Sequence, residues 1–193
     1  MKKIITILML SCFQSLYAQQ GPALQPASRS LEAPLIYAAV IGKPMPAFSA
    51  SSGDRLVSNN DLKGKVVYIN FWFSACPPCI TEIEQLNILA AKYLNDPSVI
   101  FLSITYDDDA DIVAAKAKYN IAYDVYRLNR TECNELINNG GYPTNIILNA
   151  DGEVVYMHAG GSTNKEKNES FYSNEIYPVI ERERELYQAS VTR

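Results

Sequence analysis

Histidine and cysteine are scarce in this chain of 193 residues, which contains one histidine and four cysteines. A structural zinc site takes four nitrogen or sulfur ligands at short, regular spacings. His158, Cys133 and the carboxylates do not follow any such spacing. The sequence therefore argues against a zinc site.

Basic charge and long apolar runs are also lacking. The chain has 17 Lys and Arg residues against 21 Asp and Glu residues, a net charge of −4. This balance does not suit a protein that binds a phosphate backbone. The apolar stretch at residues 4–10 is too short for a permanent membrane span, which needs roughly 20 residues.

The amino terminus has the pattern of an export signal. Two lysines precede the short apolar stretch, which predicts a signal peptide over residues 1–18, cleaved after Ala18. Alternatively, residues 10–12 resemble a bacterial lipobox, in which Cys12 is lipidated and anchors the protein. Either outcome places the protein in the periplasm or cell envelope of a bacterium. We interpret residues 19–40 as a spacer and residues 41–188 as one folded domain.

Hydrophobic patterning predicts an α/β domain. A continuous apolar run at 66–73 and a second at 99–105 indicate buried strands, and helical spacing at 77–95 joins them into a right-handed βαβ unit with parallel strands. Further elements are expected downstream: a helix at 107–119, a short strand at 123–126, a helix at 131–137, a hairpin at 144–157 and a helix at 168–188.

Two cysteines separated by two prolines lie between the first strand and the helix after it. Cys76 and Cys79 are close enough in sequence to form a disulfide within one helical turn, so the pair can exchange two electrons with a partner. The loop that such a disulfide closes is too small to constrain the unfolded chain much. This favours a redox-active pair over the alternative of an inert structural disulfide.

Residues 71–79, the helix after them, and the segment 141–144 ahead of the hairpin resemble the thioredoxin superfamily, specifically its exported branch of TlpA- and ResA-like thiol-disulfide oxidoreductases. The resemblance covers about residues 41–185. It implies a thioredoxin-like fold with a central mixed sheet flanked by helices, an N-terminal extension and an inserted helix at 107–119.

Three residues are candidates for the chemistry. Cys76 falls at the start of the helix, where free backbone N–H groups and the helix dipole stabilise a thiolate, so it is the predicted nucleophile. Cys79 is the predicted resolving thiol. Glu82 matches a glutamate position of ResA-like proteins and is a candidate for proton transfer to or from Cys79; the alternative is a solvated helix acid.

The resemblance also implies a surface that contacts the partner. Pro143 corresponds to the cis-proline of the family and Tyr142 precedes it. Together with Trp72, Pro77 and Pro78, these residues are expected to bind the partner protein.

The sequence departs from the family at two positions. Asn70 stands where many thioredoxins have a buried aspartate, and Ala75 stands where the family often has tryptophan. We expect the loss of that tryptophan to open the surface over Cys76. Of the remaining candidates, we interpret Cys133 as a buried packing residue rather than a third redox thiol, and His158 as a surface residue at a strand end.

The predicted function is reduction of disulfides in exported proteins through a redox-active Cys76–Cys79 disulfide, with no bound cofactor. The resemblance implies cytochrome c maturation or general thiol upkeep as settings, with electrons from a membrane-embedded donor. Two alternatives are a thiol peroxidase of the same fold and a binding module of the cell envelope with a structural disulfide. The stretch 70–76 lacks the Pro and Thr that a peroxidase loop carries, which disfavours the first.

Overall fold

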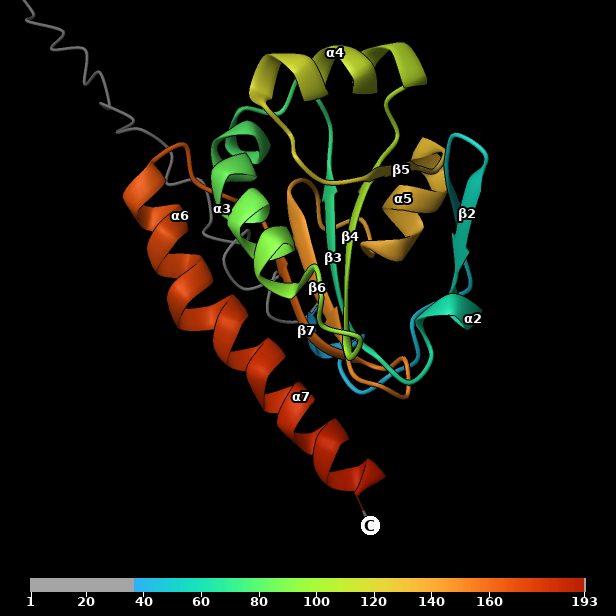
Figure 1. Ribbon diagram of the computed structural model, residues 1–193. Coiled ribbons are helices and arrows are strands. Elements are labelled where there is room, and N and C mark those ends of the chain that lie inside the picture. The colour runs from blue at the N-terminus through green and yellow to red at the C-terminus, as the bar shows by residue number, and fades with distance from the viewer. Residues whose placement is uncertain (1–36, 193) are drawn as a thin grey trace, which may run out of the picture.

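A computed structural model describes residues 37–192 (Figure 1). The predicted signal peptide at 1–18, the lipidation site Cys12 and most of the predicted spacer lie outside the described residues. Within residues 37–192, every helix is too short or too polar to cross a membrane.

Seven strands and seven helical segments follow one another along the described chain. The strands are β1 (Ser49–Ser52), β2 (Arg55–Ser58), β3 (Val66–Trp72), β4 (Val99–Thr105), β5 (Val125–Arg127), β6 (Thr144–Leu148) and β7 (Val154–Ala159). The helical segments are α2 (Asn59–Leu62), α3 (Pro77–Tyr93), α4 (Asp109–Tyr119), α5 (Arg130–Leu136), α6 (Lys165–Phe171), the π turn η1 (Tyr172–Ile176) and α7 (Tyr177–Val191).

All seven strands form one mixed sheet with the order β2-β1-β5-β4-β3-β6-β7. β3 and β4 are parallel, as are β4 and β5, whereas β6 pairs antiparallel with both β3 and β7. The predicted βαβ unit, hairpin and mixed sheet are therefore confirmed. The β1–β2 hairpin at the sheet edge was not predicted, because its serine-rich strands lack an apolar run.

Helices cover both faces of the sheet (Figure 1). One hydrophobic cluster contains side chains of β3 and α5, and a second contains the alternate side chains of β3 together with residues of α3 and α7. Every residue of β3 is buried as a result. This explains why the strand reads as a continuous apolar run rather than an alternating one.

The folded domain begins before residue 41. The Tyr37 hydroxyl accepts a hydrogen bond of 2.9 Å from the backbone N–H of Ala159, and Val40 packs against the core. The predicted end of the spacer at residue 40 is therefore a few residues too late. The apolar stretch at residues 35–41 follows a more polar segment, so the sequence carried a signal for this boundary that the prediction did not use.

The C-terminal helix contains a π turn that the sequence analysis did not predict. Pro178 lies in the first turn of α7, and its ring would clash with the carbonyl of Asn174 in a regular α-helix. We attribute the wider turn η1 to this clash. The buried residues of the segment then recur every four positions, at Asn168, Tyr172, Ile176 and Ile180.

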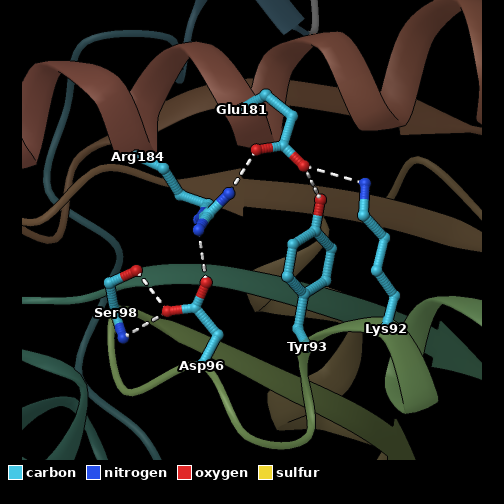
Figure 2. Close-up of polar contacts among 6 residues, drawn as sticks. All are labelled: Lys92, Tyr93, Asp96, Ser98, Glu181 and Arg184. Atoms are coloured by element: carbon cyan, nitrogen blue, oxygen red, sulfur yellow. Dashed lines mark hydrogen bonds and ion pairs between the residues drawn. The ribbon is translucent and has the colours of Figure 1, made fainter.

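Polar side chains fasten α7 to the end of α3 and the turn before β4. Figure 2 shows the six residues involved: Lys92, Tyr93, Asp96, Ser98, Glu181 and Arg184. The Glu181 carboxylate accepts hydrogen bonds from Lys92, Tyr93 and Arg184. Burial alone would raise the pKa of Glu181, but these three donors outweigh it and lower the pKa to about 2. The Glu181 carboxylate is therefore ionised where α7 packs against the end of α3.

Candidate active site

The cysteine pair lies at the N-terminus of α3, directly after β3. Cys76 is the N-cap residue, and Pro77 and Pro78 occupy the first two helical positions, where a missing N–H costs no intrahelical hydrogen bond. The Cys79 backbone N–H donates to Cys76 Sγ over 3.3 Å. The two sulfur atoms form a disulfide, with a Cα–Cα distance of 5.2 Å. The helix N-terminus thus directs the Cys79 N–H and the helix dipole at Cys76.

Both sulfurs are almost covered by the surrounding protein. Cys76 is 3% exposed and Cys79 is 1% exposed. The expectation that Ala75 opens the surface over Cys76 is therefore wrong. Phe73 and Tyr142 pack against the hydrophobic cluster that contains both cysteines.

Trp72 does not belong to the partner surface. Its side chain is 1% exposed and packs in the same hydrophobic cluster as the two cysteines. The prediction that Trp72 binds the partner is wrong, because the last residue of β3 points into the core beneath α3. Pro77 is exposed and Pro78 is half-buried, so both prolines remain accessible.

Glu82 is buried one helical turn beyond Cys79, with 1% of its surface exposed. The interpretation of Glu82 as a solvated helix acid is therefore wrong. Asn70 Nδ2 donates a hydrogen bond of 2.7 Å to Glu82 Oε1. Burial is the largest influence and raises the pKa of Glu82 to about 8, although the hydrogen bond from Asn70 opposes it. Both protonation states of Glu82 are accordingly populated near neutral pH.

A cavity of about 290 Å³ separates Glu82 from the loop after β7 and from α6. Its wall includes His158 and the exposed Lys167. His158 is half-buried rather than at the surface, with its ring 4.8 Å from that of Phe171, and burial lowers its pKa. The cavity brings an interior carboxyl next to surface residues.

Pro143 lies at the start of β6, and the Tyr142–Pro143 peptide bond is cis. The loop after β7 passes directly over this proline. A Cβ placed on Gly161 would lie 2.8 Å from Pro143 Cγ and 3.4 Å from Pro78 Cβ. Gly161 therefore allows the loop, the proline and the start of α3 to pack together.

Three partly buried aromatic rings contact one another beside Pro143. The ring centroids of Phe73 and Tyr106 are 5.3 Å apart, those of Phe73 and Tyr142 are 5.4 Å apart, and those of Tyr106 and Tyr142 are 5.5 Å apart. The Arg130 guanidinium lies 5.0 Å from the Tyr106 ring centroid. This aromatic cluster is therefore apolar but carries one cation.

Cys133 is remote from the redox pair. It is fully buried in the hydrophobic cluster on the α5 face of the sheet, whereas Cys76 and Cys79 belong to the cluster on the α3 face. Burial raises the pKa of the Cys133 thiol to about 12. A thiol in these surroundings stays protonated and packs as a small apolar residue, as predicted.

Sequence reasoning missed the residues that surround Glu82. Asn70 and Asn145 face each other in the antiparallel register of β3 and β6, and Tyr172 reaches the same region from η1. The two asparagines carried a signal, because each interrupts an otherwise apolar strand. Helical spacing places Tyr172 on the same buried face as Asn168, but it gives no signal for which strand residues Tyr172 meets.

Comparison with known proteins agrees with this geometry. A model of the Redoxin family matches residues 41–175. The chain is 32% identical over 135 residues to the thiol-disulfide oxidoreductase ResA of Bacillus cereus, which covers 68% of this chain and 76% of the relative. It is 29% identical over 167 residues to the thiol:disulfide interchange protein DsbE of Pseudomonas fluorescens, covering 83% and 86% of the two chains.

A solved structure of a thiol-disulfide oxidoreductase from Bacteroides fragilis is also similar. It superimposes with a TM-score of 0.55 and 22% identity, over 67% of this chain and 99% of the other. At this level of identity the likeness shows a shared fold alone.

Proposed function

The chain belongs to the Redoxin family and is a ResA-like thiol-disulfide oxidoreductase of the thioredoxin superfamily, and we propose that Cys76 and Cys79 carry out its exchange reaction. The observation that supports this most is the position of the pair, joined as a disulfide across the first turn of α3. Cys76 as the N-cap receives the field of the helix N-terminus, which favours its thiolate.

In the proposed reaction the reduced protein donates two electrons to a partner disulfide. The Cys76 thiolate attacks one partner sulfur, which forms a mixed disulfide and releases the other partner sulfur as a thiolate. Cys79 then gives its proton to the Glu82 carboxylate and attacks Cys76 Sγ. This forms the internal disulfide and releases the second partner thiolate, which takes a proton from Glu82 or water. A dithiol donor returns the pair to the reduced state by the reverse sequence.

The surroundings of Glu82 suit a proton acceptor for Cys79. A general base works best when its pKa lies near the working pH, and burial has raised the pKa of Glu82 to about 8. The adjoining cavity supports exchange of that proton with solvent, because it is bordered by the exposed Lys167. No bound cofactor takes part in the proposed reaction.

The partner is proposed to bind across Pro77, Pro78, Tyr142 and Pro143. The prolines at the start of α3 remain accessible, and Tyr142 belongs to the aromatic cluster beside Pro143. The backbone next to Pro143 would then hold a partner segment so that its disulfide reaches Cys76. In the mixed disulfide, the sulfurs of Cys79, Cys76 and the partner would lie in one line.

We propose an extracytoplasmic setting for this exchange. The support is the signal-like pattern of residues 1–18, with lipid anchoring through Cys12 as the alternative outcome of processing. The partners would be exported proteins with reducible disulfides, including those of cytochrome c maturation. Electrons would come from a membrane-embedded donor.

A trapping experiment tests the exchange reaction. The Cys79→Ser variant keeps the nucleophile but cannot resolve the mixed disulfide, so we expect partner proteins to accumulate on Cys76. Cys76→Ser should trap none, and Cys133→Ser should behave like the unmodified protein. An absence of trapped species in the first variant would contradict the proposal, and peroxide consumption that survives Cys79→Ser would indicate a peroxidase instead.

A further inference from the structure

The parallel strands β3 and β4 end side by side, at the edge of the sheet where the cysteine pair begins. The register pairs the last residues of the two strands, Trp72 and Thr105. β3 continues into a turn of residues 73–76, in which the Cys76 backbone N–H donates to the Phe73 carbonyl over 3.1 Å. β4 continues into the segment that precedes α4. The turn that leads to the nucleophile therefore has the end of β4 as its neighbour.

Asp107 joins these two segments through its side chain. Its carboxylate oxygen Oδ2 accepts a hydrogen bond of 2.6 Å from the Ser74 backbone N–H. Asp107 is only 8% exposed, and its own backbone N–H donates to the Thr105 hydroxyl over 3.2 Å. The Thr105 carbonyl accepts in turn from the Leu128 N–H over 3.0 Å. The carboxylate is thus fixed to the end of the sheet and binds the turn that leads to Cys76.

The acids that follow Asp107 have a different role. Asp108 is exposed, and its side chain accepts from the Asp111 N–H over 2.9 Å as the N-cap of α4. Asp109 and Asp111 are exposed in the first turn of α4, where they interact favourably with the helix dipole. Asp107 differs from all three, because it is buried and its hydrogen bond leads away from α4 toward the redox site.

A buried carboxylate is a costly way to satisfy one backbone N–H. Burying a charged group lowers stability, and a neutral oxygen would accept the same hydrogen bond with a smaller loss. A carboxylate does, however, form a shorter and stronger hydrogen bond than a neutral acceptor. Such a strong bond is useful where the chain must keep its geometry during a reaction. The turn 73–76 meets that condition, since it ends at the sulfur that attacks the partner.

We propose that Asp107 is a positioning residue for disulfide exchange: its carboxylate fixes the turn 73–76, and the turn holds the Cys76 sulfur at the N-terminus of α3. There the Cys79 N–H donates to that sulfur over 3.3 Å. In the reduced protein this hydrogen bond favours the thiolate, because it is made to the charged form. The inference rests on the proposed role of Cys76 as the nucleophile. Asp107 acts on Cys76 only through the backbone of Ser74.

Two uncharged substitutions separate the hydrogen bond of Asp107 from its charge. Asp107→Ala and Asp107→Asn remove the same negative charge, and this removal by itself would lower the Cys76 pKa equally in both. Only asparagine keeps an oxygen that can accept from the Ser74 N–H. Without that bond the turn loosens and the thiolate loses part of its stabilisation. The Cys76 pKa should therefore be about one unit higher in Asp107→Ala than in Asp107→Asn, a tenfold difference in proton affinity.

The measurement is the ultraviolet absorbance of the Cys76 thiolate against pH, in the full chain with the other three cysteines replaced by serine. The remaining titratable groups around the site are the same in both variants. They are Glu82 on α3, Tyr142 before β6, and Tyr106 with Arg130 beside it. Equal pKa values in the two variants, or a higher value in Asp107→Asn, would overturn the inference.

Asp108→Ala and Asp108→Asn form the matched control pair. They differ in the same way, because alanine loses a carboxylate–N–H bond that asparagine can keep, but this bond caps α4 and does not reach the turn 73–76. The Cys76 pKa should be the same in these two variants. A difference as large as that at position 107 would reflect general loosening of the fold and would contradict the inference.

A further variant and a rate measurement complete the test. If Asp107→Ala does not fold, Asp107→Leu fills the same space without an acceptor and takes its place. If neither folds while Asp107→Asn does, the bond serves folding and the inference fails. With all cysteines present, turnover of a disulfide substrate at its high-pH plateau should be about tenfold slower in Asp107→Ala than in Asp107→Asn, because a misplaced sulfur attacks less readily. If the unmodified protein shows no exchange at all, the proposed function fails, while the Cys76 titration still tests Asp107.

Discussion

Replacing Glu82 with glutamine should stabilise the folded protein, and the gain should grow with pH. Burial raises the pKa of this carboxyl from 4.5 to about 8. Between these values the folded protein keeps the proton and the unfolded chain releases it, so the free energy of unfolding falls as the pH rises through this window. Glutamine does not titrate and keeps an oxygen that accepts a hydrogen bond from Asn70 Nδ2. The free energy of unfolding of the glutamine variant should therefore not fall over this pH range.

The size of the effect follows from the pKa shift. Each pKa unit corresponds to about 1.4 kcal/mol, so the full shift amounts to about 5 kcal/mol above pH 8. Near pH 4, where the unmodified carboxyl is protonated in both states, the variant and the unmodified protein should differ little. Urea denaturation of the oxidised proteins across this pH range measures the difference directly.

Glu84→Gln is a control on the same helix. Glu84 is exposed and pairs with Lys165 at 2.8 Å. Exposed ion pairs typically contribute about 0.2–1 kcal/mol, so this variant should change stability little at any pH. A constant difference between Glu82→Gln and the unmodified protein from pH 4 to pH 9 would refute the assignment of Glu82 as a buried carboxyl with a raised pKa.

Two further substitutions test other parts of the structure. Gly161→Ala would place a methyl group 2.8 Å from Pro143 Cγ, so it should slow disulfide exchange and lower stability by about 1–3 kcal/mol, measured by turnover of a disulfide substrate and by urea denaturation. Glu181→Gln weakens the cluster that holds α7, where the pKa of Glu181 is lowered to about 2. Because this carboxylate is partly exposed, its loss should cost only about 1 kcal/mol at pH 7. That difference should vanish as the pH falls from 4.5 toward 2, and a difference that persists at pH 2 would contradict the ion-pair account.

Local patterns in the sequence were sufficient to predict the elements that carry the cysteines. The apolar runs of β3 and β4 and the helical spacing of α3 predicted the βαβ unit, because both strands are buried on both faces. The same patterns placed Cys76 at the start of α3. The hairpin strands β1 and β2 escaped detection, since they bury few side chains and join the sheet only where β1 pairs with the distant β5.

The burial of Glu82 could have been predicted in part from the sequence. Position 82 falls on the same helical face as Cys79, Ile83 and Leu86, which are all buried. A carboxyl on that stripe indicates an interior acid rather than a solvated one. The misreading of Trp72 had a similar origin, because an apolar strand end was assigned by family position and not by the direction of its side chain.

The contact between Tyr68 and Tyr172 was beyond sequence reasoning. The two residues are 104 positions apart and lie on different elements, β3 and η1. Periodicity reports which face of an element is buried, but it does not report which residues of two distant elements meet. The network around Glu82 therefore required the structure.

The ionisation of Cys76 tests the central claim most directly. In the full chain with Cys12, Cys79 and Cys133 replaced by serine, ultraviolet absorbance of the thiolate against pH reports this one sulfur. A helix N-terminus commonly lowers a thiol pKa to about 3.5–7.5, and we expect Cys76 to titrate within that range. A thiolate that forms only at about pH 8.5 or above, as in a free cysteine, would contradict the account.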